Sequence, residues 1–341
     1  MHNLTENLKK ITVFSDLSTT ELRQLSGYFQ PFSCDAGTRI IAQATSHNGL
    51  YLILSGSVEV RLKIFGGGEL SIAKLKAFDA FGEISLISRY PATANVIAEE
   101  AVSGLLLTPI SMETISIIYP QLADKIKSAI ALRCCQRSRL LLKHLPSKIN
   151  HQHSWSEPIA MKKSFSPEIS TFNMTDLNHF LKKPQLNPLP IPFFNALHQD
   201  EIDILNPWVK LGVVYRGDGV KYSSTDENGF YGLLWGAVQA VILGEHMIKV
   251  ATYGPGDLFG TIEYIDRLPN PYRYVAREDA VYLFLNEKGM INIKKKLPAL
   301  WGKIMRLLLA SVGGQMSNIN WIFLQLNIED VYKVSQGKNH V

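Results

Sequence analysis

The chain has 341 residues, which is enough for two domains that each bury a core of their own. A hydrophobic share of 46% with 19% charged residues is ordinary for a globular protein, and no apolar run reaches the length of a membrane span. A scattered net charge of +5 does not indicate nucleic-acid binding, and three cysteines provide neither a disulfide framework nor metal-ligand spacing. We therefore expect no metal and no membrane span. The N-terminus lacks the apolar core of a signal peptide, which indicates a cytoplasmic protein; delivery through a C-terminal secretion signal stays open.

The first half of the chain has the pattern of a capped helix, several short strands and a long helix. Ser18 and Glu21 have the spacing of a helix capping box. Segments rich in β-branched residues, separated by glycine-bearing turns, predict strands at Gly37–Ala42, Leu50–Leu54 and Val58–Ile64. Pro120 suits the first turn of a helix, and apolar residues at helical spacing extend that helix to about Leu145. Such strands favour an antiparallel double-sheet roll, or jelly roll, that is followed by a long closing helix.

Between the strands and the long helix, the stretch Phe81–Ala98 (FGEISLISRYPATANVIA) has the pattern of a ligand-binding corner. A strand ends at Phe81, and Gly82 lets a ligand approach the backbone because it has no Cβ. Residues 84–88 can form one short helical turn, whose first free N–H groups suit an anion. We take this stretch as the candidate binding site.

The same pattern recurs in the second half of the chain. Gly56 recurs as Gly236, and after a slip of two residues in a hairpin loop, Gly82 recurs as Gly260. The sequence therefore predicts one module present twice, the second with a closing helix from Leu297 to about Leu326. The predicted organisation is a first domain over 1–146, a Pro-, Ser-, Asn- and Lys-rich linker over 147–190, a second domain over 191–330 and a tail over 331–341.

The Phe81–Ala98 stretch resembles the phosphate-binding cassette of cyclic nucleotide-binding domains, the β-roll modules of the catabolite activator family and of protein kinase A regulatory subunits. The family pattern is F-G-E-(I/L)-A-L, about four residues, then P-R-x-A-x-V. The resemblance implies a mainly β fold with helices: two tandem antiparallel β-rolls (double-stranded β-helices), each with a closing helix. It also implies a cyclic mononucleotide, cAMP or cGMP, as the ligand of the first roll. The pocket would be formed by Phe81, Gly82, Glu83, Ile84, Ser85, Ala92 and Thr93.

One landmark of the family pattern is missing, because the arginine that holds the cyclic phosphate is replaced by Ala92. Losing such a charged partner costs on the order of 2–5 kcal/mol, or roughly 30- to several-thousand-fold in affinity. Glu83 has two interpretations: it contacts the ribose 2′-OH, as the resemblance implies, or it caps the short helix. A substitute cation could come from Arg89, Lys63, Arg133 or Arg137. Ala92→Arg is expected to confer or sharply improve cyclic-nucleotide affinity.

The second cassette departs further from the family pattern. Thr261 stands at the glutamate position and Asn270 at the arginine position, while Tyr272 adds bulk where the phosphate would lie. We interpret this copy as a scaffold or partner-binding module.

The remaining motifs narrow the function. The sequence contains no nucleophile elbow, P-loop or zinc signature, so we expect no enzyme, and it leaves no room for a helix-turn-helix, so we expect no DNA binding. The favoured function is a degenerate regulatory or scaffold module that acts through a protein partner. The alternative is a cyclic-nucleotide sensor that regulates a partner through its first roll. Two modes of association stay open: a homodimer through the closing helices, and a pairing of the two closing helices within one chain.

Overall fold

The computed structural model describes residues 2–46, 48–63, 68–88, 91–149, 201, 208–220, 228–243, 247–269 and 273–335. Contacts between residues group the chain into two units: Met1–Leu141 with Met316–Val341, and Leu142–Gln315. The second group differs from the predicted second domain, which runs to residue 330. The predicted linker lies almost entirely outside the described residues, and the domain boundaries stay a prediction.

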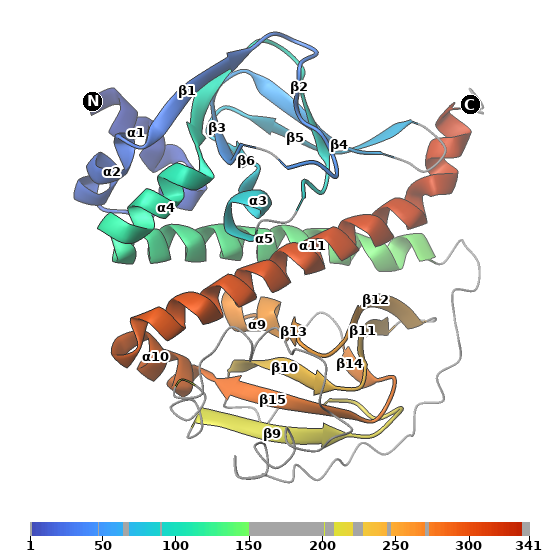
Figure 1. The fold of residues 1–341 in the computed structure, drawn as a ribbon. Coiled ribbons are helices and arrows are strands. Elements are labelled where there is room, and N and C mark those ends of the chain that lie inside the picture. Colours follow the sequence, from blue (N-terminus) through green and yellow to red (C-terminus); the bar gives the residue numbers. More distant parts are fainter. Residues whose placement is uncertain are drawn as a thin grey trace. The chain divides into compact units, whose positions relative to one another are not determined.

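The first unit carries one roll with its helices (Figure 1). Its elements are α1 (His2–Lys10), η1 (Thr12–Phe14), α2 (Thr19–Ser26), β1 (Phe29–Cys34), β2 (Arg39–Ile41), β3 (Leu50–Ser55), β4 (Ser57–Lys63), β5 (Glu69–Lys76), β6 (Ala80–Phe81), α3 (Glu83–Ser88), β7 (Asn95–Ala98), β8 (Val102–Leu107), α4 (Pro109–Ile118) and most of α5 (Pro120–Ile149).

The second unit carries a second roll. Its elements are β9 (Val209–Val214), β10 (Gly229–Trp235), β11 (Val238–Leu243), β12 (Met247–Tyr253), β13 (Leu258–Phe259), α9 (Thr261–Asp266), β14 (Arg273–Ala276), β15 (Ala280–Asn286), α10 (Glu287–Lys296) and the first part of α11 (Pro298–Ser335). Both predicted closing helices are present, as α5 and α11. Helix α11 extends nine residues beyond its predicted end at Leu326, to Ser335, and its residues from Met316 onward group with the first unit.

The two rolls have the same strand order, which confirms the predicted fold class and the repeat. One sheet runs β1-β8-β3-β6 in the first roll and β9-β15-β10-β13 in the second. The other runs β2-β7-β4-β5 in the first roll and β14-β11-β12 in the second, where an isolated bridge between Gly219 and Val275 takes the place of β2. The named strand pairs are all antiparallel.

Backbone conformation explains which positions recur. Gly82 and Gly260, at the two cassette corners, have φ of 82° and 74°, in the left-handed region that favours glycine. Gly256 also lies in this region, with φ of 94°, and its counterpart in the first roll is Phe78, with φ of 73°. A bulky residue is strained there, whereas the glycine of the second roll adopts the same conformation without strain.

The core of the first roll lies between its two sheets and includes residues from α11. Apolar side chains of β3, β4, β6 and β7 form one buried cluster, to which Ala92 of the cassette and Leu324 of α11 also belong. Leu324 retains only 2% of its surface exposed. The last part of α11 is therefore a structural element of the first unit. Within the described residues, no helix combines the length and the apolar character that a membrane crossing requires.

The predicted capping box is present at α2, and it gives the first unit a pH-dependent contact. Glu21 accepts hydrogen bonds from the backbone N–H of Ser18 at 2.8 Å and from Nζ of Lys125 at 2.7 Å. The bond from Lys125, followed by that from Ser18, lowers the pKa of Glu21 from 4.5 to about 2. Because the folded-state pKa is depressed, this stabilisation is fully present above pH 4.5 and is lost as pH falls towards 2.

We therefore expect Glu21→Gln to lower the free energy of unfolding by about 1 kcal/mol at pH 7, and by little near pH 2. The value is discounted because the Lys125 side chain is 55% exposed. Urea unfolding at the two pH values measures the difference. Glu113→Gln, at an exposed position of α4, is the control; an equal loss for Glu21→Gln at both pH values would contradict the assignment.

Candidate functional site

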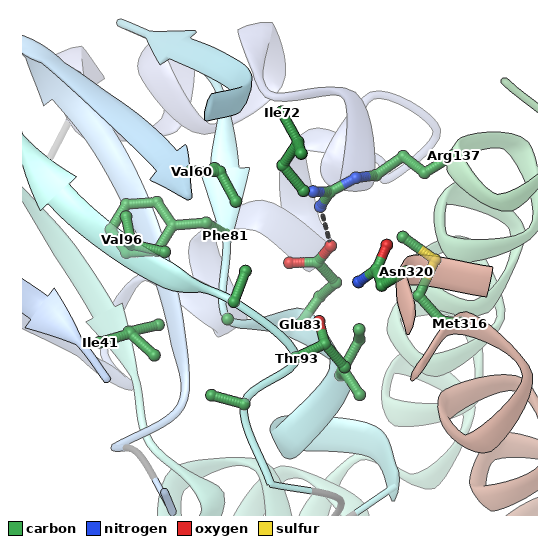
Figure 2. A pocket seen from close by; sticks show the side chains of 14 residues that line it. Ile41, Val60, Ile72, Phe81, Glu83, Thr93, Val96, Arg137, Met316 and Asn320 are labelled. Atoms are coloured by element: carbon green, nitrogen blue, oxygen red, sulfur yellow. Dashed lines mark hydrogen bonds and ion pairs between the residues drawn. The ribbon is translucent and has the colours of Figure 1, made fainter. Parts of the chain in front are cut away.

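The Phe81–Ala98 cassette encloses a small cavity within the first unit (Figure 2). Its volume is about 40 Å³. The lining residues are Ile41, Val60, Ile72, Phe81, Gly82, Glu83, Ile84, Ala92, Thr93, Ala94, Val96, Arg137, Met316 and Asn320. The structure thus brings together six of the seven candidate site residues; Ser85 lies on α3, and its side chain is outside the described part. Their role as a ligand site stays a prediction.

Glu83 begins α3 at the corner that Gly82 makes possible, and an ion pair holds it there. Its side chain is buried, with 3% of the surface exposed, and its Oε1 accepts a hydrogen bond from the guanidinium of Arg137 on α5. The dashed line in Figure 2 marks this pair. The negative charge of Glu83 raises the pKa of Arg137 above its ordinary value. Neither interpretation from the sequence, ribose contact or helix cap, included this partner.

No cation occupies the place of the family arginine among the described residues around Ala92. Ala92 is 7% exposed, and its backbone N–H donates to the carbonyl of Thr45 at 2.9 Å while its carbonyl accepts from Ala44 at 2.8 Å. Of the four cations considered as substitutes, Arg137 lines the cavity but is engaged by Glu83. Arg133 pairs with Asp79 at 3.4 Å, Lys63 is exposed at the end of β4, and Arg89 lies outside the described residues.

Two residues of α11 complete the cavity wall, and neither was among the candidate site residues expected from the sequence. Met316 is 2% exposed, and its sulfur receives a hydrogen bond from the hydroxyl of Ser138 on α5 at 3.0 Å. Asn320 is 4% exposed and lies opposite Glu83 in the view of Figure 2. The sequence predicts the closing helix from Leu297 to about Leu326, but it singles out neither residue.

The cavity is far too small for a nucleotide. A volume of about 40 Å³ holds one or two water molecules, since water occupies about 30 Å³ in the liquid. Pockets for ligands of nucleotide size usually measure about 300 Å³ or more. A cyclic nucleotide seated wholly in this cavity would therefore have to displace side chains that line it, such as Arg137 and Met316.

The corresponding corner of the second roll is filled by its own polar side chains. Thr261 takes the position of Glu83, and its hydroxyl accepts a hydrogen bond from Gln315 of α11 at 2.8 Å. Gln315 is the counterpart of Arg137, because the offset that relates Thr261 to Glu83 also relates these two residues. One roll thus has a charged pair between cassette and closing helix, and the other has a neutral pair. Asn270 and Tyr272 lie outside the described residues.

Tyr274 fills the interior beside this neutral pair. Its side chain is 1% exposed; the hydroxyl accepts a hydrogen bond from the N–H of Gly260 at 3.0 Å and donates one to Glu263 at 3.2 Å. We expect Tyr274→Phe to lower the free energy of unfolding of the second unit by about 1–3 kcal/mol, because a buried N–H loses its acceptor. Urea denaturation checks this, with Tyr215→Phe at an exposed tyrosine as the control; equal stability of both variants would contradict the contact.

Comparisons with known proteins find a family match within the first roll. Residues 31–114 match the family model of the cyclic nucleotide-binding domain. A cAMP-dependent protein kinase regulatory subunit of Yarrowia lipolytica is 33% identical over 92 residues, which are 27% of this chain and 24% of that protein. The Cyclic AMP receptor protein of Thermus thermophilus is 31% identical over 100 residues, 29% of this chain and 46% of that protein. The matched regions thus span a quarter to about half of these relatives.

Two solved structures align over most of this chain, with low TM-scores. The regulatory domain of Toxoplasma gondii PKA, crystallised with cAMP, aligns over 89% of this chain and 94% of that one, with a TM-score of 0.32 and 17% identity. The regulatory subunit of a cAMP-independent protein kinase A from Trypanosoma brucei aligns over 87% and 92%, with a TM-score of 0.31 and 17% identity. The sequence matches confirm, over the part of the chain they cover, the family resemblance read from the cassette.

Proposed function

We propose that this chain is a non-enzymatic regulatory or scaffold module whose first roll works without a cyclic nucleotide and acts through a protein partner. The family match supports a regulatory role, since its curated relatives include kinase regulatory subunits. The observation that carries the proposal is the Glu83–Arg137 pair. This pair lies in the cassette corner beside Ala92, which we call the Glu83 cradle, and it leaves a cavity of about 40 Å³.

The energetics of the cradle support the same conclusion. A cyclic phosphate that entered beside Ala92 would meet the N–H groups of α3 without an adjacent cation, and it would approach the carboxylate of Glu83. To recruit Arg137, the ligand would have to break a buried ion pair and leave Glu83 uncompensated, which costs several kcal/mol. Backbone donors at the start of a six-residue helix do not offset this cost.

A thermal-shift screen of the full chain with cAMP and cGMP tests the proposal. Ligand at about 100 times its Kd stabilises a protein by about 2.7 kcal/mol, so a screen at millimolar concentration detects micromolar binding. We expect no shift for either nucleotide. We also expect that proteins co-purified with the chain from its source cells are the same with and without added nucleotide. A nucleotide-dependent shift, or a partner released by nucleotide, would overturn the proposal.

A second candidate function is a cyclic-nucleotide sensor that uses Arg137 as its phosphate-binding cation. The observation in its favour is that Arg137 lines the cavity and keeps 26% of its side-chain surface exposed, so it has room to exchange partners. This candidate predicts a thermal shift with cAMP or cGMP that Arg137→Gln abolishes and Arg133→Gln does not. The two functions therefore give opposite results in one screen.

A further inference from the structure

Helix α10 of the second unit presents lysines to the solvent. The helix lies between β15 and α11 in the chain (Figure 1), and one side of it is buried against the second roll through residues such as Ile293. At 3.6 residues per turn, Lys288 and Lys295 lie on the opposite side, with Lys294 and Lys296 at its two edges. All four lysines are exposed. We call these four residues the lysine face.

The lysine face keeps its positive charge, because the acidic residue beside it is engaged elsewhere. Glu287 is the only acidic residue in the sequence of α10, and its Oε1 accepts a hydrogen bond from the guanidinium of Arg267 at 2.5 Å. Within the described part of the chain, no carboxylate pairs with Lys288, Lys295 or Lys296. Four positive charges thus lie close together with no compensating negative charge among them.

Two apolar side chains lie among these lysines. Ile291 lies between Lys288 and Lys295 on the outer side of the helix, and 60% of its surface is exposed. Trp301, at the start of α11, is partly buried, and Nζ of Lys294 lies 5.1 Å from the centroid of its ring. A single exposed isoleucine is common on protein surfaces. At the centre of a lysine cluster, however, it gives a partner both charge and apolar area to bind.

The fold does not require this pattern, because the equivalent helix of the first roll lacks it. Helices α4 and α10 each have ten residues and begin after a side chain that caps the helix, from Thr108 and Asn286. Counted from these caps, Lys288, Lys295 and Lys296 correspond to Ile110, Ile117 and Ile118, and Ile291 corresponds to Glu113. Lysine at these positions is therefore specific to the second roll.

The helix dipole explains only part of the lysine face. Cations in the last turn of a helix are stabilised by the dipole, which suits Lys294, Lys295 and Lys296. The same dipole makes a cation unfavourable in the first turn, where Lys288 lies. It also gives no reason for the exposed isoleucine. A negatively charged partner that also covers apolar area accounts for the whole pattern.

We propose that the lysine face, with Ile291 at its centre, binds the surface of a membrane that contains anionic lipids. Each lysine near such a surface strengthens binding roughly fivefold, and an apolar side chain can enter the boundary between headgroups and acyl chains. A nucleic acid would satisfy the lysines, but its phosphates would leave Ile291 in water. The exposed face of a helix is convex, and a fluid lipid surface adapts to it.

The binding is expected to be reversible. The apolar side of α10 already packs against the second roll, so the contact depends on the four lysines and Ile291 alone. Four fivefold factors and about tenfold for the isoleucine give half-maximal binding at roughly 0.1 mM accessible lipid. The inference goes beyond the proposed function and does not depend on the Glu83 cradle.

Co-sedimentation of the full chain with vesicles tests the proposal. The vesicles are phosphatidylcholine alone, or phosphatidylcholine with about 30% phosphatidylserine, which supplies the anionic surface. We expect binding to the anionic vesicles only, and loss of that binding between about 0.1 M and 1 M salt, because the Debye length falls from about 10 Å to 3 Å. Equal binding to both kinds of vesicle, or to neither, would overturn the inference.

A matched pair of triple variants assigns the binding to the lysine face. The variant Lys288→Gln, Lys295→Gln, Lys296→Gln is expected to bind anionic vesicles roughly 100-fold more weakly. The control variant Lys76→Gln, Lys143→Gln, Lys249→Gln removes the same charge at exposed positions elsewhere and is expected to bind as the unmodified chain does. Equal losses for the two variants would show that net charge, and not this face, is responsible.

The isoleucine distinguishes a membrane from another polyanion. Ile291→Ser, at an exposed position that the fold does not depend on, should weaken vesicle binding about tenfold. Ile110→Ser, at the exposed isoleucine of α4, is the control and should have no effect. A DNA duplex is the comparison ligand. If Ile291→Ser left vesicle binding unchanged and the duplex bound more tightly than the vesicles, the membrane assignment would be wrong and a nucleic acid would be the partner.

Discussion

Replacing Arg137 by alanine is expected to lower the free energy of unfolding of the first unit by about 3 kcal/mol. The substitution leaves the Glu83 carboxylate buried, with 3% of its side chain exposed, and without the cation that compensates it. Removing one member of a buried pair typically costs 3–5 kcal/mol, and the lower value applies because Arg137 is 26% exposed. Denaturant unfolding of the full chain gives the change, and hydrogen exchange at the amides of β3 and β8 assigns it to the first unit.

The second roll provides the matched rescue for this experiment. Thr261 and Gln315 form its neutral equivalent of the Glu83–Arg137 pair. We therefore expect the double variant Glu83→Thr, Arg137→Gln to recover most of the loss, because no charge is then buried. Arg137→Gln alone should remain destabilised, and Glu83→Thr alone should cost only about 1 kcal/mol, since Arg137 can turn towards water. Additive effects of the two single substitutions would contradict a direct pair.

The fold and the repeat could be predicted because they depend on local backbone constraints, which act on residues close together in the sequence. The turns at Gly56 and Gly236 have φ of 88° and 82°, and a Cβ at either glycine would lie within 2.3 Å of a backbone oxygen. Such positions accept glycine almost alone, so they recur in the sequence at fixed spacing. The capping box of Ser18 and Glu21 and the proline at the start of α5 were predictable for the same reason.

The side-chain contacts in the Glu83 cradle were less predictable, because they join segments that are far apart in the sequence. The sequence identified Glu83 and the missing cation at Ala92, and it named Arg137 only as one of four substitutes. The partner of Glu83 depends on which face of α5 meets α3, and apolar periodicity gives that face only to within about a residue. Met316 and Asn320 were not identified, because the helix that carries them begins in the second unit.

Restoring the family arginine is expected to have its largest effect only after the cradle is opened. Ala92 is 7% exposed and packs in the core of the first roll, so Ala92→Arg alone should destabilise the first unit by about 1–3 kcal/mol and give no cAMP binding. From the sequence, the single substitution Ala92→Arg was expected to be enough for cyclic-nucleotide binding. The structure corrects this expectation, because the cavity must be enlarged as well. Combining it with Met316→Ala and Asn320→Ala removes two side chains that close the cavity.

In that opened background, Ala92→Arg should raise cAMP affinity roughly 30- to several-thousand-fold over Ala92→Gln, which supplies side-chain volume without charge. Calorimetry measures both variants. The guanidinium can hold the phosphate with two hydrogen bonds and can also offset its repulsion from Glu83. Equal affinity of the arginine and glutamine variants would show that the missing cation is not what prevents cyclic-nucleotide binding. The closed geometry around Glu83 and Arg137 would then be the sole barrier, and opening the cavity without any charge should be enough to admit the ligand.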